Sequence, residues 1–143
     1  MSARSLWAWG TVDRFPDVAA RQRLAAMARM LTGGAPVALR PLPRDEDAQV
    51  PAARAGALRG LDDLCSVAPR DRAAHAYGKG YPDLVRGFAG DFSAAPDLVV
   101  RPRSAEDVAR VLDACADARI AVVPYGGGTS VVGGVEIGLT NLA

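Results

Sequence analysis

The chain contains 143 residues, of which 50% are hydrophobic and 23% are charged, and its formal net charge is +1. This composition is typical of a single folded domain, and the charge balance excludes a general attraction to nucleic acid. The sequence has neither the roughly 20 consecutive apolar residues that a membrane-spanning helix needs nor an N-terminal signal segment, so we expect a cytoplasmic protein with no membrane span.

Residues 1–34 are predicted to form an anchored aromatic segment followed by a helix. Trp7 and Trp9 are expected to fix the N-terminal segment on the body of the protein. A helix is predicted from about Asp17 to Leu31, with Asp17 as its N-cap and two glycines, residues 33–34, at its end. Its apolar residues recur at helical spacing and comprise Val18, Leu24, Met27, Met30 and Leu31.

Residues 35–70 contain five prolines, which remove backbone donors and disfavour helix in the residue before them. We therefore predict an extended connection, with one short helix near residues 52–61. Residues 1–70 are interpreted as a helical, proline-rich N-terminal extension, and residues 71–143 as the first part of the domain that carries the function.

From residue 71 onward the pattern predicts an α/β (α+β) fold. After a turn of helix at 71–77 and a loop at 78–82, the β-branched run at 98–102 predicts a strand. The next helix has Ser104 as its N-cap and Asp107 in place for a capping box. Residues 120–123 predict a second strand, which would complete a βαβ unit with a parallel strand pair, and a third strand would begin near 139–142. The apolar face of the helix comprises Val108, Val111, Leu112 and Cys115.

The most informative segment is the glycine-rich loop at residues 124–134, directly after the second predicted strand. Three successive glycines let the backbone approach a ligand closely, and consecutive N–H groups with the hydroxyls of Thr129 and Ser130 suit a diphosphate. Two better-known phosphate motifs are excluded, because GxGxxG would need glycine in place of Val131 and a P-loop would need lysine in place of Gly134. A plain connecting loop without a ligand is the alternative.

Five motifs along the chain resemble a known family. They are WAWG at 7–10, HAYGKGYPDL at 75–84, PDLVVRP at 96–102, SAEDV at 104–108 and PYGGGTSVVGG at 124–134. The last three resemble the FAD-linked oxidases of the vanillyl-alcohol-oxidase type, which have a PCMH-type FAD-binding domain. The first two look most like the alkyldihydroxyacetonephosphate synthase branch, and D-lactate dehydrogenases and glycolate oxidase subunits belong to the same family.

The resemblance implies that the loop binds the FAD pyrophosphate through backbone amides and hydroxyls. It implies either electron transfer from a 2-hydroxy acid or a similar small molecule, or the synthase reaction, in which an alkyl group replaces an acyl group. An FAD-linked D-lactate or glycolate dehydrogenase is one alternative, and a non-enzymatic α/β interaction module without a cofactor is another. The residues implied in cofactor binding are Pro124, Tyr125, Gly126, Gly127, Gly128, Thr129, Ser130, Val131, Gly133 and Gly134.

The resemblance also implies that this chain is a truncated part of a flavoenzyme. In such proteins the FAD-binding domain continues past the loop and a substrate-binding cap domain follows, so no catalytic residue is assigned and activity of this chain alone is left open. We expect weak or no FAD binding by residues 1–143 alone, because the apolar strands would lack neighbours. His75, the single histidine, is interpreted as a structural residue, and no metal site is predicted. The substrate, the electron acceptor and the oligomeric state are left open.

Overall fold

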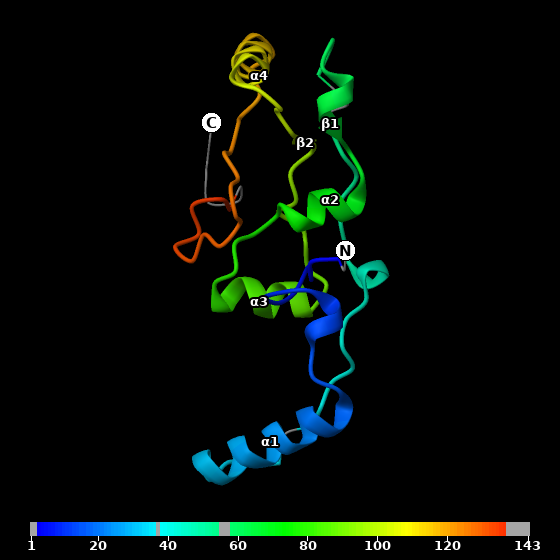
Figure 1. Cartoon of the computed structure of the whole chain (residues 1–143), viewed down its shortest axis with the longest axis vertical. Helices are drawn as coiled ribbons and strands as arrows, with labels where there is room; N and C mark the ends of the chain where they lie inside the picture. The colour runs from blue at the N-terminus through cyan, green and yellow to red at the C-terminus, as the bar shows by residue number, and fades with distance from the viewer. Residues whose placement is uncertain (1–2, 37, 55–57, 137–143) are drawn as a thin grey trace.

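The computed structural model describes residues 3–36, 38–54 and 58–136, and it combines helices with one small sheet. The strand pair and the last helix lie at one end of the long axis, two helices lie in the middle, and the first helix lies at the other end (Figure 1). The predicted α/β (α+β) class is confirmed. The elements are α1 (Val18–Thr32), β1 (Cys65–Ser66), α2 (Pro69–Ala74), α3 (Tyr81–Phe88), β2 (Val99–Val100) and α4 (Ala105–Asp117), with 3₁₀ turns at Val12–Arg14, Asp45–Asp47 and Asp62–Leu64.

The ends of α1 follow the capping signals in the sequence. The Asp17 carboxylate accepts a hydrogen bond from the Ala20 N–H at 2.7 Å, which satisfies one of the donors left free at a helix N-terminus. Gly33 has φ +63°, the left-handed conformation that ends many helices, and its N–H donates to the Arg29 carbonyl. The prediction of this helix is therefore confirmed at both ends.

The apolar residues of α1 are not buried in the described chain. Even the least exposed of them, Met27, is 50% exposed, and Met30 is 79% exposed. The helix lies apart from the other elements at the end of the long axis (Figure 1). Helical spacing thus predicted where the helix forms but not what its apolar side packs against. The residues concerned are Val18, Leu24, Met27, Met30 and Leu31.

The predicted parallel βαβ unit is wrong for the described part of the chain. β2 lies within the strand predicted at 98–102, but its partner is β1, and the pair is antiparallel, with Cys65 opposite Val100. Residues 120–123 form no strand. The Ile120 N–H instead donates to the Cys115 carbonyl at 2.8 Å and so extends the hydrogen bonding of the end of α4. A β-branched run becomes a strand only where another strand offers a ladder, and no described segment pairs with this one. The third predicted strand lies outside the described residues.

Two further expectations differ from the structure. Residues 52–54 and 58–61 are not helical, and the remainder of the helix predicted near 52–61 lies outside the described residues. The loop predicted at 78–82 ends early, because α3 already begins at Tyr81. Proline is tolerated in the first turn of a helix, so Pro82 does not break α3. The Asp83 carboxylate accepts the Gly80 N–H at 3.1 Å and caps this start.

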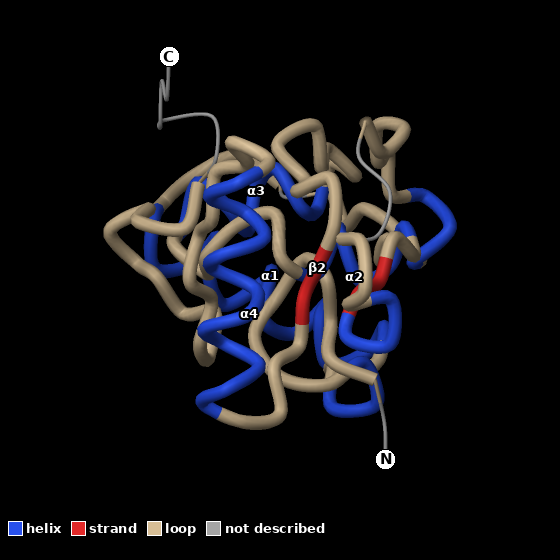
Figure 2. The backbone as a smooth tube through the Cα atoms, turned by 90° about the horizontal axis from the view of Figure 1, so that it is seen from above, coloured by secondary structure: helices blue, strands red, loops and turns tan. Residues whose placement is uncertain are grey.

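Two small apolar clusters form the core, and β2 runs between α4 and α2 (Figure 2). One cluster joins the aromatic N-terminal segment to α2 and the residues after α3, and the other joins the segment at 58–65 to the inner face of α4. The first comprises Leu6, Trp7, Ala73, Ala76, Tyr77 and Phe92. The second comprises Leu58, Leu61, Leu64, Val111 and Cys115.

A buried arginine ties the proline-rich connection to the segment that precedes β2. Arg72 is only 3% exposed; its guanidinium donates to the Pro96 carbonyl at 2.6 Å and to the Pro51 carbonyl at 2.8 Å. The segment around Pro51 is therefore packed against Arg72 and the residues around Pro96. Within the described residues, no helix has the length and apolar character to cross a membrane, and no three potential metal ligands gather.

Candidate functional site

The glycine-rich loop is folded into bends and turns and is not extended. Gly128, Ser130 and Gly133 all have positive φ, at +72°, +22° and +77°. Among the amides of residues 126–134, only the Gly133 N–H donates to backbone within the described chain, to the Ser130 carbonyl at 2.9 Å. The N–H groups of residues 126–132 find no acceptor in the described part of the protein. The loop thus offers several consecutive donors that the fold itself does not use, the property expected of an anion nest.

The three successive glycines have two different surroundings. A Cβ added at Gly126 or Gly127 would meet no atom within 4 Å, and neither residue has a positive φ. A Cβ at Gly128 would overlap the Tyr125 hydroxyl oxygen and lie 2.6 Å from the ring carbon that bears it. The fold therefore requires glycine at position 128, whereas nothing in the described chain requires it at 126 and 127.

Tyr125 fixes the start of the loop. Its hydroxyl donates to the Ala74 carbonyl at 2.9 Å, and the Tyr77 carbonyl lies 3.2 Å away. Its ring lies against His75, with ring centroids 4.6 Å apart. His75 Nδ1 is 2.7 Å from the Asp71 carbonyl; because a carbonyl only accepts, this nitrogen carries the proton. These contacts support the interpretation of His75 as a structural residue.

Replacing Tyr125 with phenylalanine is expected to lower the free energy of unfolding by about 1–2 kcal/mol at neutral pH, because the Ala74 carbonyl loses its donor. Burial raises the pKa of Tyr125 above its usual value. The unfolded chain therefore ionises this phenol at lower pH than the folded chain does, and the contribution, complete below about pH 10, is lost as the pH rises further. Denaturant unfolding of both proteins at pH 7 and above pH 10 checks this. A difference that grows in alkali would contradict it.

The middle and the end of the loop are also held by residues of the 74–86 segment. The Lys79 N–H donates to the Thr129 carbonyl at 2.8 Å. Beyond the glycines, Glu136 forms an ion pair with Arg86, whose guanidinium carbon lies 5.2 Å from the centre of the Tyr77 ring. Bonding to Glu136 raises the pKa of Arg86. One neighbouring segment thus fixes the loop at Tyr125 and Thr129 and fixes the chain just after it at Glu136, which limits how far the loop backbone can move.

The structure keeps the predicted site residues on one continuous loop with different exposures. Gly128 is buried and Tyr125 is half-buried, whereas Val131 is 70% exposed. Sequence reasoning missed the residues beneath the loop, although two glycines around the single lysine of the chain were a usable signal. The missed residues are Gly78, Lys79, Gly80, Arg86 and Glu136.

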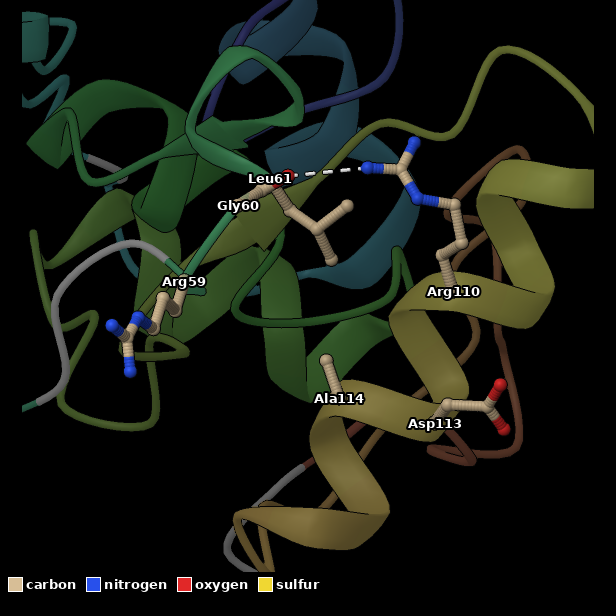
Figure 3. Close-up of a pocket in the computed structure, with 6 residues that line it drawn as sticks. All are labelled: Arg59, Gly60, Leu61, Arg110, Asp113 and Ala114. Atoms are coloured by element: carbon tan, nitrogen blue, oxygen red, sulfur yellow. Dashed lines mark hydrogen bonds between the residues drawn. The ribbon is translucent and has the colours of Figure 1, made fainter.

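A shallow pocket of about 260 Å³ lies elsewhere, between the segment at 59–61 and α4 (Figure 3). Arg110 points across it and donates to the Gly60 carbonyl at 3.1 Å. Arg59 and Asp113 also line it. None of its lining residues belongs to the glycine-rich loop, so this pocket is separate from the candidate site.

Comparison with known proteins shows what parts of the chain resemble. Residues 96–141 match the family described as FAD binding domain. The chain is 36% identical over 84 residues to an alkyldihydroxyacetonephosphate synthase of Trypanosoma brucei brucei, covering 53% of this chain and 14% of that protein. It is 50% identical over 38 residues to the mitochondrial D-lactate dehydrogenase [cytochrome] of Arabidopsis thaliana, covering 27% of this chain and 7% of that protein. A solved alkyldihydroxyacetonephosphate synthase superposes with a TM-score of 0.62 at 29% identity, over 68% of this chain and 20% of that one.

These matches confirm the resemblance and the cofactor that it implied. Residues 96–141 match an FAD-binding domain, and FAD is the cofactor of that domain. The chain spans only 14% of the Trypanosoma relative's length and 11% of the length of a Dictyostelium discoideum one.

Proposed function

We propose that the loop at residues 124–134 binds the pyrophosphate of FAD, as part of a flavin-dependent oxidoreductase or an alkyldihydroxyacetonephosphate synthase-like enzyme. The observation that carries the proposal is the row of N–H groups at residues 126–132 that have no acceptor in the described chain. Donors held in place before a ligand arrives need little reorganisation when a diphosphate binds. The hydroxyls of Thr129 and Ser130 would add neutral donors to the same group.

The open glycines support the same proposal. Gly126 and Gly127 have free space where a side chain would begin, so a ligand can approach their backbone closely. When bound, FAD supplies electron-transfer chemistry at its isoalloxazine ring, and the protein orients that ring. In this proposal residues 71–143 are the first part of the FAD-binding domain and residues 1–70 are an extension that packs on it.

The synthase-like assignment is favoured over the dehydrogenase one by the extent of similarity. The match to the Trypanosoma synthase extends over 84 residues, against 38 for the Arabidopsis dehydrogenase. We propose a small-molecule substrate and a cytoplasmic location for the protein. A D-lactate or glycolate dehydrogenase is the second candidate, and the substrate consumed by the protein made from the complete reading frame distinguishes the two.

Gly126→Ala and Gly127→Ala test the proposed loop. Neither methyl group meets an atom of the described chain, so both apoproteins are expected to unfold at the wild-type temperature. FAD affinity is expected to fall about tenfold or more, because the methyl group occupies the space of the pyrophosphate. FAD fluorescence titrations of the protein from the complete reading frame give the affinities.

Gly34→Ala is the matched control. Gly34 lies just beyond α1, and a Cβ there would meet only the flexible Thr32 side chain. This variant is expected to bind FAD as the wild type does. If the wild-type protein binds FAD and the two loop variants bind it equally well, the assignment of the loop is wrong. If the wild-type protein does not bind FAD, the proposed function is wrong.

A further inference from the structure

We propose that Gly78, Lys79 and Gly80, here called the GKG segment, form a platform that turns the amides of the glycine-rich loop toward the FAD pyrophosphate. This inference rests on the proposed function of the loop. It assigns a positioning role to three residues that do not themselves belong to the cofactor-binding loop.

Gly78 lies in direct contact with the backbone of the loop. A Cβ at this position would be 2.5 Å from the Ser130 carbonyl oxygen and 3.0 Å from the Thr129 carbonyl oxygen. Real Cβ atoms essentially never lie within 3.0 Å of another heavy atom, and a backbone oxygen cannot rotate away as a side chain can. Gly78 does not have a positive φ, so close approach and not conformation explains the glycine.

The other two residues of the GKG segment continue this contact. The Lys79 N–H donates to the Thr129 carbonyl at 2.8 Å. A Cβ at Gly80 would lie 3.3 Å from the Val131 carbonyl oxygen. The carbonyls of three consecutive loop residues, 129–131, therefore all lie against the GKG segment.

This arrangement decides the direction of the loop amides. In a planar trans peptide the C=O of one residue and the N–H of the next point in opposite directions, and the described chain has no cis peptide. Carbonyls of residues 129–131 that face the GKG segment therefore direct the N–H groups of residues 130–132 away from it. These N–H groups are among those that find no acceptor in the described chain.

The GKG segment is itself fixed from behind. The Lys79 ammonium donates to the Leu6 carbonyl at 2.9 Å, which ties it to the aromatic N-terminal segment. Burial lowers the pKa of Lys79. The Gly80 N–H is held by Asp83 at the start of α3. The side chain of the single lysine thus points to the N-terminal segment, so Lys79 positions the loop and is not a phosphate ligand.

Gly78→Ala and Gly87→Ala form a matched pair that tests the platform. Each adds one methyl group against backbone, but the Cβ at Gly87 meets the Cα of Trp7, at 3.0 Å, and no loop atom. Both variants are expected to lower the unfolding temperature of the protein from the complete reading frame. Only Gly78→Ala is expected to weaken FAD binding, by about tenfold, in fluorescence titrations of the folded protein. Equal FAD affinities of the two variants would overturn the platform.

A second readout does not depend on FAD. In the ligand-free protein, the Lys79 amide is expected to exchange its hydrogen at least about tenfold faster in Gly78→Ala than in Gly87→Ala, because its bond to the Thr129 carbonyl is broken. Hydrogen-exchange mass spectrometry of a peptide that spans Lys79 measures this rate. Unchanged exchange would also overturn the platform.

Gly80→Ala serves if Gly78→Ala does not fold. Its Cβ contact of 3.3 Å is milder, and we expect a FAD affinity between those of Gly78→Ala and the wild type. Wild-type FAD affinity in Gly80→Ala would overturn the platform while leaving the proposed function intact. A wild-type protein without FAD affinity would overturn both.

Discussion

Replacing Trp7 with alanine is expected to lower the free energy of unfolding by about 3–5 kcal/mol. Trp7 is only 8% exposed and belongs to the first apolar cluster. Its ring stacks on Phe15 at 4.6 Å between centroids and meets the edge of Phe88 at 5.4 Å. Its indole N–H donates to the Pro43 carbonyl at 3.1 Å. The alanine variant would lose these contacts together and leave a cavity between the N-terminal segment and α3.

Trp9→Ala is the control for this substitution, because Trp9 is 53% exposed two residues away. It is expected to cost less than about 1 kcal/mol. Denaturant unfolding followed by far-ultraviolet circular dichroism measures both variants. A cost for Trp7→Ala as small as that expected for Trp9→Ala would show that the N-terminal segment does not pack on α3 in solution. The prediction that tryptophans anchor this segment would then be right for neither residue.

The helices could be predicted because their signals are local. The Asp17 carboxylate caps α1 and the Ser104 hydroxyl caps α4, where it accepts the Asp107 N–H at 3.1 Å. Each cap joins residues three positions apart, so it is readable directly from the sequence. The predicted capping box at α4 is incomplete, because the Asp107 carboxylate accepts from the Arg103 N–H and not from Ser104.

The sheet could not be predicted because its pairing is not local. The β-branched run at 120–123 has high strand propensity but no partner in the described chain, whereas Cys65–Ser66 has little strand character and pairs with Val99–Val100. Which segment pairs depends on how the whole chain packs, and strand propensity mainly reflects that packing. Packing of the whole chain also decides which residues on the predicted apolar face of α4 are buried. Val111 and Cys115 are buried, whereas Leu112 remains 50% exposed.

The candidate site also has a local part that could be predicted from the sequence and a long-range part that could not. The loop at 124–134 was visible in the sequence because its glycines and hydroxyls are contiguous. The contact between Gly78 and Ser130 joins residues 52 positions apart, and no periodicity marks it. Gly78 has an ordinary backbone conformation, so its φ does not require glycine. Close approach to another segment of the chain then remains as the reason for a glycine at this position.

Replacing Gly128 with alanine is expected to cost about 2–5 kcal/mol of unfolding free energy and to weaken FAD binding by more than about tenfold. Two effects add at this residue. Its φ of +72° is strained for any residue with a Cβ, and the added methyl group would overlap the Tyr125 ring. Relief of that overlap would push the Tyr125 hydroxyl away from the Ala74 carbonyl, so the start of the loop would come loose.

The double variant Gly128→Ala, Tyr125→Ala separates the two effects. Removing the ring abolishes the overlap but keeps the strained φ. In the Tyr125→Ala background, Gly128→Ala is therefore expected to cost only the roughly 1–2 kcal/mol of left-handed backbone strain. Thermal and denaturant unfolding of the wild type, the two single variants and the double variant completes this double-mutant cycle. An undiminished cost in the absence of the ring would mean that Tyr125 does not pack on Gly128, and the loop would then need a different anchor to hold its amides ready for a diphosphate.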